Sequence, residues 1–400
     1  EERKAFLETI VCEQDIYTED FIFPDWERVR QRLHSDDAVV QICTYKDEES
    51  TKYVAMVGDV DTGRCKIVRL PSPEEIQFRF NDESMERLDS ILWSRLLPHA
   101  LHAHRIFIQP SGSFHDLPLE YTPEVWEKYD VRRISSLSAL LDDYPSSAGI
   151  YSIALFGGLD YDAAEEARPV YGSFTGAIGY FKELTATKTE TDDIAQLFSS
   201  HNQPKALFQG KIGTERAFME LPTYSPPLDI IHLATHSGAL PENFLTSKFQ
   251  KEHHSIADHF LGRCFVALSG ANEALLVSNG TYDGLLLGSE IKVLDLKQVN
   301  LVVIGSNSSK STTDATLDVP WNLNNSFKKA GVKTILGAIN SSIGDEATLI
   351  LMKEFYKQLL SGRTKHQSLL SAIHHLRTTE EMKYDQPLFW ASFVLIDALE

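Results

Sequence analysis

The sequence predicts an α/β protein in which a layered sheet carries helices on both faces and a smaller α/β half precedes it. From residue 150 onward, short apolar runs alternate with helical segments, which is typical of parallel strands joined by helical crossovers. The first 149 residues contain short β-rich runs separated by charged or glycine-bearing turns, a pattern typical of an antiparallel meander. The chain has 400 residues and 42% hydrophobic content, which is enough for two buried cores.

The first half is predicted to begin with a helix in residues 1–35, where apolar residues recur at helical spacing. The runs "AVVQICTY", "KYVAMVGDV" and "CKIVRL" predict the strands of the meander. A helix over residues 84–102 then leads into the strand of "HRIFIQPSG". The segment "DDYPSSAG" has the composition of a linker, so we expect domains at residues 1–149 and 150–400.

The second half is predicted to alternate strands and helices. The expected strands are "IYSIALFGGL", "KALFQG", "LDIIHLAT", "NLVVIGS", "VKTILGAI" and "FWASFVLIDAL". We expect "CFVALSG" and "EALLVSNG" to form a hairpin. The expected helices are "TETDDIAQLF", "GTERAFMEL" with a threonine cap, "DGLLLGSEI", and residues 318–330, 345–361 and 366–378. In such sheets, functional groups gather at the carboxyl ends of the strands.

Composition and charge limit the classes of partner. The formal charge is -19 at pH 7 and the acids are dispersed, so we expect no contact with nucleic acid or anionic lipid and an easier match with a basic protein surface. No apolar run reaches the roughly 18 residues that a membrane helix needs, and the first residues contain neither a signal-peptide core nor an initiator Met. We therefore expect a soluble fragment of a longer chain. Cys12, Cys43, Cys65 and Cys264 form no C-x-x-C pair, which fits a reducing cytoplasm.

Two strand ends carry polar turns with the residue types of a nucleophile and a base. His236 follows "IIHLAT", and the small residues Ser237 and Gly238 leave backbone N–H groups able to approach a substrate carbonyl. After "LVVI", a glycine precedes Ser306 and Asn307. If the two strands are neighbours, His236 lies beside this second turn. A structural role for a histidine at a strand end is the alternative.

The sequences and the order of the segments along residues 150–398 resemble those of the CHAT family of caspase-like peptidases, relatives of caspases and separase. The resemblance rests on "ALFGGLDYD", "LTATKTETDDI", "GTERAFMEL", "LDIIHLATHSGAL", "LSGANEAL", "DGLLLGSEIKVLDL", "NLVVIGSNSSK", "FKKAGVKTIL", "DEATLILMKEFYKQLLSG", "SLLSAI" and "PLFWASFVLIDAL". It implies a caspase-like CHAT domain over residues 150–400. The earlier segments "DWERVRQRLHSDDAVVQICTY", "IFIQPSGSFHDLPLEY" and "VRRISSLSALL" are similar to a non-catalytic pseudo-caspase half, which in bacterial proteins of this type often follows a tetratricopeptide (TPR) array.

The resemblance also implies roles for the two turns. In the family, the His of "HLATH" is the general-base partner, and a Cys in an "LVVLSAC-x-T-G" turn is the nucleophile. His236 matches the first, whereas the second position holds Asn307 in a gapless match or Ser306 after a shift of one residue. An amide cannot attack a carbonyl. A serine hydroxyl is a far poorer nucleophile here than a thiol, since a thiol is partly ionised near neutral pH.

Further departures from the family pattern favour an inactive pseudo-peptidase that binds or regulates a partner protein. Ser237 stands where the family has a glycine, Lys310 replaces another glycine, and "AINSSIGD" lacks the tryptophan usual ahead of Asp345. One alternative is a cysteine endopeptidase of a bacterial TPR-CHAT system, with its nucleophile mutated, that cuts a partner protein. Ser306 as a working nucleophile and a scaffold without any site are the remaining alternatives.

Acidic residues near strand or helix ends are candidates for binding a basic substrate side chain next to the cut bond. These candidates are Asp345, Glu290 and Asp283, each of which also has the position of a helix-start or capping acid. We expect neither a metal nor a cofactor. His232 and His236 are four apart in a strand and turn rather than on a helix, and "LFGGLD" lacks the G-x-G-x-x-G spacing of nucleotide sites.

Overall fold

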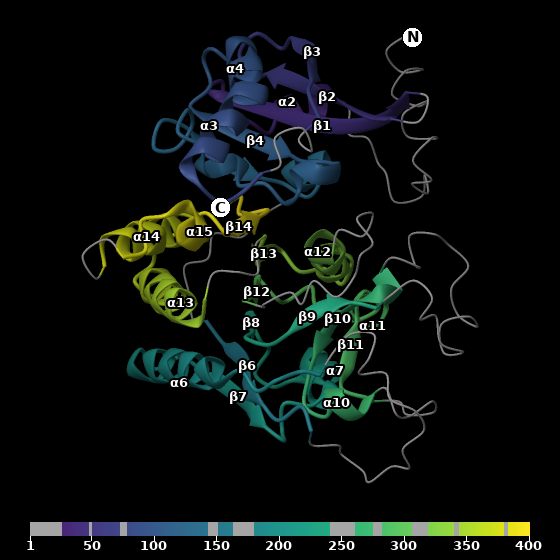
Figure 1. The fold of residues 1–400 in the computed structure, drawn as a ribbon, viewed down its shortest axis with the longest axis vertical. Coiled ribbons are helices and arrows are strands. Elements are labelled where there is room, and N and C mark those ends of the chain that lie inside the picture. Colours follow the sequence, from purple (N-terminus) through teal and green to yellow (C-terminus); the bar gives the residue numbers. More distant parts are fainter. Residues whose placement is uncertain are drawn as a thin grey trace. The chain divides into compact units, whose positions relative to one another are not determined.

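The fold is described from a computed structural model of the chain, which divides into two compact units (Figure 1). Unit 1 comprises Glu1–Pro145 and Gln386–Glu400, and unit 2 comprises Ser146–Asp385. The structure describes residues 26–47, 50–72, 78–142, 151–162, 180–240, 261–274, 282–305, 319–339, 344–379 and 383–400. The chain returns to unit 1 at its end, whereas the sequence predicted a second half that continues to residue 400.

The sheet of unit 1 has the strand order β3-β2-β1-β4-β5-β14. Its strands are β1 (Asp37–Asp47), β2 (Ser50–Asp59), β3 (Cys65–Leu70), β4 (Arg105–Gln109), β5 (Asp130–Arg133) and β14 (Phe393–Ile396). The first three pair antiparallel, as the predicted meander requires. The pairs of β1 with β4, β4 with β5 and β5 with β14 are parallel.

Short helices cover the sheet of unit 1. They are α2 (Trp26–Arg30), α3 (Asp82–Ile91), α4 (Trp93–Leu96), η2 (Leu97–His99), η3 (Gly112–Phe114), η4 (Leu119–Tyr121), η5 (Leu137–Leu141) and α15 (Pro387–Trp390). Side chains alternate along β1, so Val40 belongs to the core with Leu88 of α3, whereas Val39 packs with Val29 of α2. The predicted helix over residues 84–102 is divided into α3, α4 and η2. Of the helix predicted in residues 1–35, only α2 lies in the described part.

Buried polar contacts bind the end of the chain to unit 1. The Tyr121 hydroxyl donates to the Phe393 carbonyl at 2.7 Å. Asp397, which is fully buried, accepts from the backbone N–H of Ser135 at 2.8 Å and from its hydroxyl at 2.6 Å. Buried polar groups without partners are costly, so these contacts select the position of β14 as specifically as its apolar residues do.

The main sheet of unit 2 has the strand order β13-β12-β8-β6-β7. Its strands are β6 (Ile153–Leu159), β7 (Lys205–Gly210), β8 (Ile230–Leu233), β12 (Leu301–Ile304) and β13 (Thr334–Ala338). All four pairings are parallel. A second, antiparallel sheet has the order β11-β10-β9, formed by β9 (Ser237–Ala239), β10 (Cys264–Ala267) and β11 (Leu285–Leu287).

Helices lie on both faces of the main sheet of unit 2, which confirms the predicted α/β fold class (Figure 1). The helices are α6 (Thr185–Ser200), α7 (Glu215–Met219), η6 (Leu221–Thr223), α10 (Ala271–Ala274), α11 (Gly288–Ile291), α12 (Val319–Lys329), α13 (Asp345–Leu360) and α14 (Lys365–Thr378). On one face, Phe198 of α6 and Tyr356 of α13 pack with ring centroids 5.7 Å apart. On the other, Phe218 of α7 and Phe327 of α12 are 6.4 Å apart.

The hairpin predicted for "CFVALSG" and "EALLVSNG" is wrong where the structure describes it. β10 pairs with β9 and β11, and the residues after it form helix α10. Gly270, with a φ of 88°, lies between β10 and α10, and the N–H of Leu268 donates to the Gly284 carbonyl at 2.7 Å. A Cβ at Gly284 would lie 2.6 Å from the Ala271 nitrogen, so this glycine permits the close approach of two backbones. The predicted helix "DGLLLGSEI" likewise begins with strand β11.

Removing one hydroxyl tests how strongly the end of the chain is held in unit 1. We expect Tyr121→Phe to lower the free energy of unfolding by about 1–2 kcal/mol, because the Phe393 carbonyl loses its buried donor. The matched change is Tyr129→Phe, at a partly buried ring to whose hydroxyl no described residue hydrogen-bonds. It should cost less than about 0.5 kcal/mol. Urea unfolding followed by tryptophan fluorescence measures both, and equal losses would contradict the assignment.

Candidate functional site

The two strands that end in polar turns are direct neighbours in the sheet. β8 pairs with β12 in parallel, with Leu233 opposite Ile304. The N–H of Gly305 also donates to the Leu233 carbonyl at 3.1 Å, so the strands end at the same level. His236 therefore follows one strand end, and positions 306 and 307 follow the other. Ser306 and Asn307 lie outside the described residues, so their side-chain positions stay predictions.

The backbone around His236 is fixed by strands on both sides. The N–H of Ala234 donates to the Phe156 carbonyl of β6 at 2.8 Å, and the N–H of Ala267 in β10 donates to the His236 carbonyl at 2.9 Å. The Thr235 hydroxyl donates to the Ala267 carbonyl at 2.6 Å. Because the turn is held by both sheets, the position of the imidazole is set by the fold rather than by a mobile loop.

The ring of His236 is held in one tautomer. Its Nε2 lies 2.8 Å from the carbonyl oxygen of Lys182, and a carbonyl only accepts, so Nε2 carries the proton. The rings of Tyr161 and Phe181 lie beside it, with centroids 5.3 and 5.5 Å away. In the neutral ring, Nδ1 then carries the lone pair, and no described residue hydrogen-bonds to it. The arrangement can accept a proton at Nδ1.

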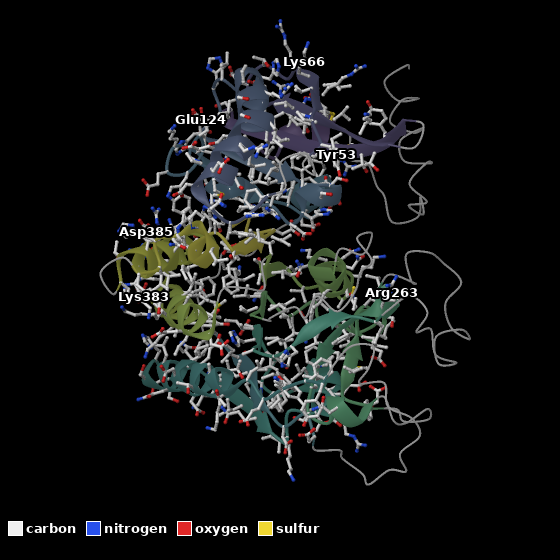
Figure 2. All side chains as sticks on the ribbon, in the orientation of Figure 1. Tyr53, Lys66, Glu124, Arg263, Lys383 and Asp385 are labelled. Carbon is white, nitrogen blue, oxygen red and sulfur yellow. The ribbon has the colours of Figure 1, made fainter. Side chains whose placement is uncertain are left out.

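The surroundings of His236 favour its neutral form. Burial lowers the pKa of His236 below 6.5, and the Lys182 carbonyl and the charge of Asp345 raise that pKa in part. Asp345 is the first residue of α13, so the structure brings it into electrostatic range of the imidazole. The next residue, Glu346, is paired instead with Lys383, which is labelled in Figure 2, at 2.9 Å.

The two candidate oxyanion donors point to opposite sides of β9. Gly238 is opposite Phe265, and the flanking pairs of this ladder, such as Leu240 with Arg263, are hydrogen-bonded. Pairs of this type recur at every second residue, so the N–H of Gly238 points into the ladder, and the N–H of Ser237 points to the other edge of the strand. This alternation favours Ser237 over Gly238 as a donor toward a substrate.

Asp283 and Glu290 belong to a different cluster. Asp283 accepts from the N–H of Leu285 at 3.0 Å at the start of strand β11, and Glu290 accepts from the N–H of Leu287 at 2.8 Å, so Glu290 acts as a capping acid of α11. Both also lie near Glu215, whose buried carboxylate accepts from the N–H of Asp283 at 2.7 Å. Among the described acids, only Asp345 acts on the pKa of His236. A substrate-binding role for Asp283 or Glu290 stays a prediction.

The structure describes three of the four cysteines. Cys43 and Cys65 belong to unit 1, and burial raises the pKa of the Cys43 thiol to about 11, the opposite of thiolate activation. Cys264 is fully buried in β10. Cys12 lies outside the described residues.

A second histidine, His232 in β8, is entirely buried. His232 Nε2 lies 3.1 Å from Glu190 Oε1 of α6, although the two atoms are not aligned as a hydrogen bond. Its Nδ1 lies 3.0 Å from the Tyr356 hydroxyl. Burial and the Glu190 charge raise the pKa of Tyr356 well above its usual value, so the hydroxyl stays protonated. A Cβ on Gly305 would lie 3.9 Å from Glu190 Oε1, so this carboxylate lies close to the end of β12.

His232 and His236 therefore have different environments: His232 contacts Glu190 and Tyr356 in the core, whereas His236 contacts the Lys182 carbonyl. Within the described ranges, no three His, Cys, Asp or Glu side chains come together as a set of metal ligands. In the same part of the chain, no helix is both long and apolar enough to cross a membrane.

Comparison with solved structures assigns the fold to the caspase-like class. A chain of the Saccharomyces cerevisiae separase–securin complex, solved at 3.0 Å resolution, matches with a TM-score of 0.52 and 10% identity. The match covers 92% of this chain and 30% of that chain. A second structure of this complex, at 2.6 Å, has a TM-score of 0.49 with the same identity and coverage. At such identity the likeness is one of fold alone.

The CHAT domain family matches residues 82–398, and the chain belongs to this family. The match begins within unit 1, so it is wider than the range of 150–400 that the sequence motifs suggested. Among curated proteins, none matches the chain.

Sequence reasoning missed the groups that orient the imidazole. The Lys182 acceptor is a backbone carbonyl, which has no side-chain signal at all. Tyr161 and Phe181 contact the His236 ring from a segment more than 50 residues earlier in the chain. Asn272 lies in the quoted segment "LSGANEAL", but nothing in the spacing of that segment indicates a contact with Phe181. The buried pair of His232 and Glu190 had no sequence signal beyond a polar residue in an apolar strand.

The protonation of His236 is directly measurable. We expect its pKa, from an NMR titration of the ring C–H signals, to lie below 6.5, and Asp345→Asn to lower it further because a favourable negative charge is lost. The unfolded state then binds more protons than the folded state below pH 6.5. His236 therefore contributes stability that is complete above pH 6.5 and is lost as pH falls through the folded pKa. A pKa above 6.5 would contradict the geometry.

Glu215 provides the opposite pH dependence in the same unit. Burial and the charges of Glu290 and Asp283 raise its pKa to about 8, so the folded state holds a proton that the unfolded state releases. Its contribution is complete below pH 4.5 and is lost as pH rises through about 8. We expect Glu215→Gln to gain stability relative to the parent chain as pH rises. Urea unfolding across this range measures the difference, and a pH-independent difference would contradict the raised pKa.

Proposed function

We propose that this CHAT-family protein is a caspase-like pseudo-peptidase that binds an extended segment of a partner protein without cutting it. The binding site in this proposal is the carboxyl edge shared by β8 and β12. His236 and the backbone of Ser237 contact the bound segment there. Asp345 is the described acid whose charge acts on the His236 imidazole, so it is the candidate for binding a basic side chain of that segment.

The observation that carries the proposal is an oriented imidazole just after β8, together with the absence of sulfur from the residues that follow the neighbouring strand β12. His236 keeps Nε2 on the Lys182 carbonyl and Nδ1 available, as general-base chemistry requires. The turn after β12 has the sequence Gly305, Ser306, Asn307, so neither candidate position supplies a thiol. A hydroxyl needs complete proton removal by the base, and an amide has no nucleophilic atom for acyl transfer.

A protein partner is supported by the fold comparison and by charge. The similar solved chain belongs to a complex of separase with securin. The formal charge of this chain is -19, which favours a basic partner surface. In the proposal the full-length protein is cytoplasmic and carries a TPR-type array before these 400 residues, as the family resemblance implies.

The second candidate function is a cysteine endopeptidase whose nucleophile has been replaced. The retained tautomer of His236 favours it, because a binding site alone does not require a basic Nδ1. In that case a thiol after β12 transfers its proton to His236, and the thiolate attacks the peptide carbonyl. The N–H of Ser237 stabilises the oxyanion.

Restoring a thiol distinguishes the two positions and tests the inactive assignment. We expect peptides bearing an electrophilic ketone to leave the parent chain unlabelled and to label either Asn307→Cys or Ser306→Cys. Adding His236→Ala to the reactive variant should slow labelling by at least about 100-fold, because base assistance is lost. Mass spectrometry of the labelled chain measures both. Labelling of the parent chain at residue 306 would contradict the proposal.

Two controls separate reactivity from binding. Ser361→Cys places a thiol at an exposed position that follows α13, and it should react no faster than a free thiol. A fluorescent peptide without the ketone should bind the parent chain and the His236→Ala variant with affinities within about fivefold, since one imidazole contact contributes about one net hydrogen bond. Absence of peptide binding to either chain would remove the support for a binding module.

A further inference from the structure

We propose that Asn272 is a positioning residue for His236, which it orients through the backbone of Phe181 and Lys182. This inference rests on the proposed role of His236, because it explains how the fold keeps one ring nitrogen basic. Asn272 is the second residue of α10 and is 8% exposed. Neither the family resemblance nor the sequence pattern indicates such a role.

The Asn272 side chain holds both polar groups of one residue. Its Oδ1 accepts from the N–H of Phe181 at 2.8 Å, and its Nδ2 donates to the Phe181 carbonyl at 2.9 Å. The same Nδ2 donates to Asp162 Oδ1 at 2.9 Å. The amide thus bonds to both backbone polar groups of Phe181, as a neighbouring strand would, and three of its hydrogen-bonding positions are used.

The segment held in this way supplies the acceptor for the imidazole. Lys182 directly follows Phe181, and its carbonyl accepts the hydrogen bond from His236 Nε2 at 2.8 Å. The Phe181 ring also packs on the imidazole at 5.5 Å and on Phe265 of β10 at 5.7 Å. Fixing both backbone groups of Phe181 leaves the next carbonyl little freedom, so the acceptor stays in place.

The backbone of Asn272 fixes the other aromatic neighbour of the ring. Its N–H donates to the Tyr161 carbonyl at 2.9 Å, and the Tyr161 ring lies 5.3 Å from that of His236. The Tyr161 hydroxyl lies 2.7 Å from Thr235 Oγ1, one residue before the histidine. The backbone contact is independent of the Asn272 side chain. A substitution at residue 272 therefore releases the Phe181 side of the ring selectively.

The tautomer of His236 is the readout that a purely structural asparagine would not change. Two-bond ¹H–¹⁵N correlation spectra of the full chain with labelled histidine, at about pH 8 where the ring is neutral, give the ratio of Nε2–H to Nδ1–H forms. His236→Gln assigns the signals. We expect Nε2–H to dominate in the parent chain. In Asn272→Ala the ratio should fall about fivefold, the effect of about one net hydrogen bond.

The matched control removes an amide at the opposite edge of the sheet. Asn300 Nδ2 donates to Asp229 Oδ1 at 3.1 Å just before β12, so Asn300→Ala removes a similar contact far from the imidazole. It should leave the tautomer ratio unchanged. An unchanged ratio in a folded Asn272→Ala variant, or an equal change in Asn300→Ala, would overturn the proposal.

Two further measurements keep the test decisive if Asn272→Ala does not fold. Asn272→Asp keeps the size and the acceptor for the Phe181 N–H but removes the donor to its carbonyl, and it should shift the ratio in the same direction. In the parent chain, the Phe181 amide proton should exchange with solvent at least about tenfold more slowly than an unprotected amide. Rapid exchange would overturn the proposal. None of these readouts requires cleavage, so they remain informative if the pseudo-peptidase assignment fails.

Discussion

The parallel register of β8 and β12 is the constraint on which the site depends. With Leu233 opposite Ile304, the two strands end together, and residues only two or three positions beyond each end must share one edge of the sheet. The antiparallel pairing of β10 with β9 then holds the backbone of His236 from the other side. Two sheets therefore fix one imidazole. A shift of register by one residue would turn His232 to the opposite face of the sheet and break its contacts with Glu190 and Tyr356.

The buried network behind β8 gives this register its specificity. His232, Glu190 and Tyr356 come from a strand and two helices, and all three are almost completely buried. Groups of this kind are costly unless they meet their partners, so they penalise every alternative packing of α6 and α13 more than an apolar cluster would. The same carboxylate lies 3.9 Å from a Cβ built at Gly305. Glu190 therefore lies close to both His232 in the core and the end of β12, where the candidate site begins.

The sequence was sufficient for the fold class and for the pairing of the two strand ends, because buried parallel strands have strong apolar patterns and their carboxyl ends must converge. It failed where the deciding contact is made by backbone or by distant residues. No sequence pattern indicates the hydrogen bond from His236 to the Lys182 carbonyl or the hydrogen bonds between Asn272 and the backbone of Phe181. The predicted hairpin after β10 was wrong, because the sequence of a glycine with positive φ followed by a short helix is similar to the sequence of a turn between two strands. The position of β14 in unit 1 depends on buried contacts such as that of Tyr121, which only tertiary structure supplies.

In the proposed site, the basic Nδ1 of His236 faces residues 306 and 307, and only sulfur is missing from this pair of groups. The most direct measurement is the pKa of a thiol placed there, obtained from thiolate absorbance as the difference between Asn307→Cys and the parent chain. A neighbouring imidazole should lower that pKa by at least about one unit below the usual value near 8.5, and adding His236→Ala should restore it. A thiol pKa of about 8.5 or higher in both Ser306→Cys and Asn307→Cys, unaffected by His236→Ala, would contradict this pairing of imidazole and nucleophile position.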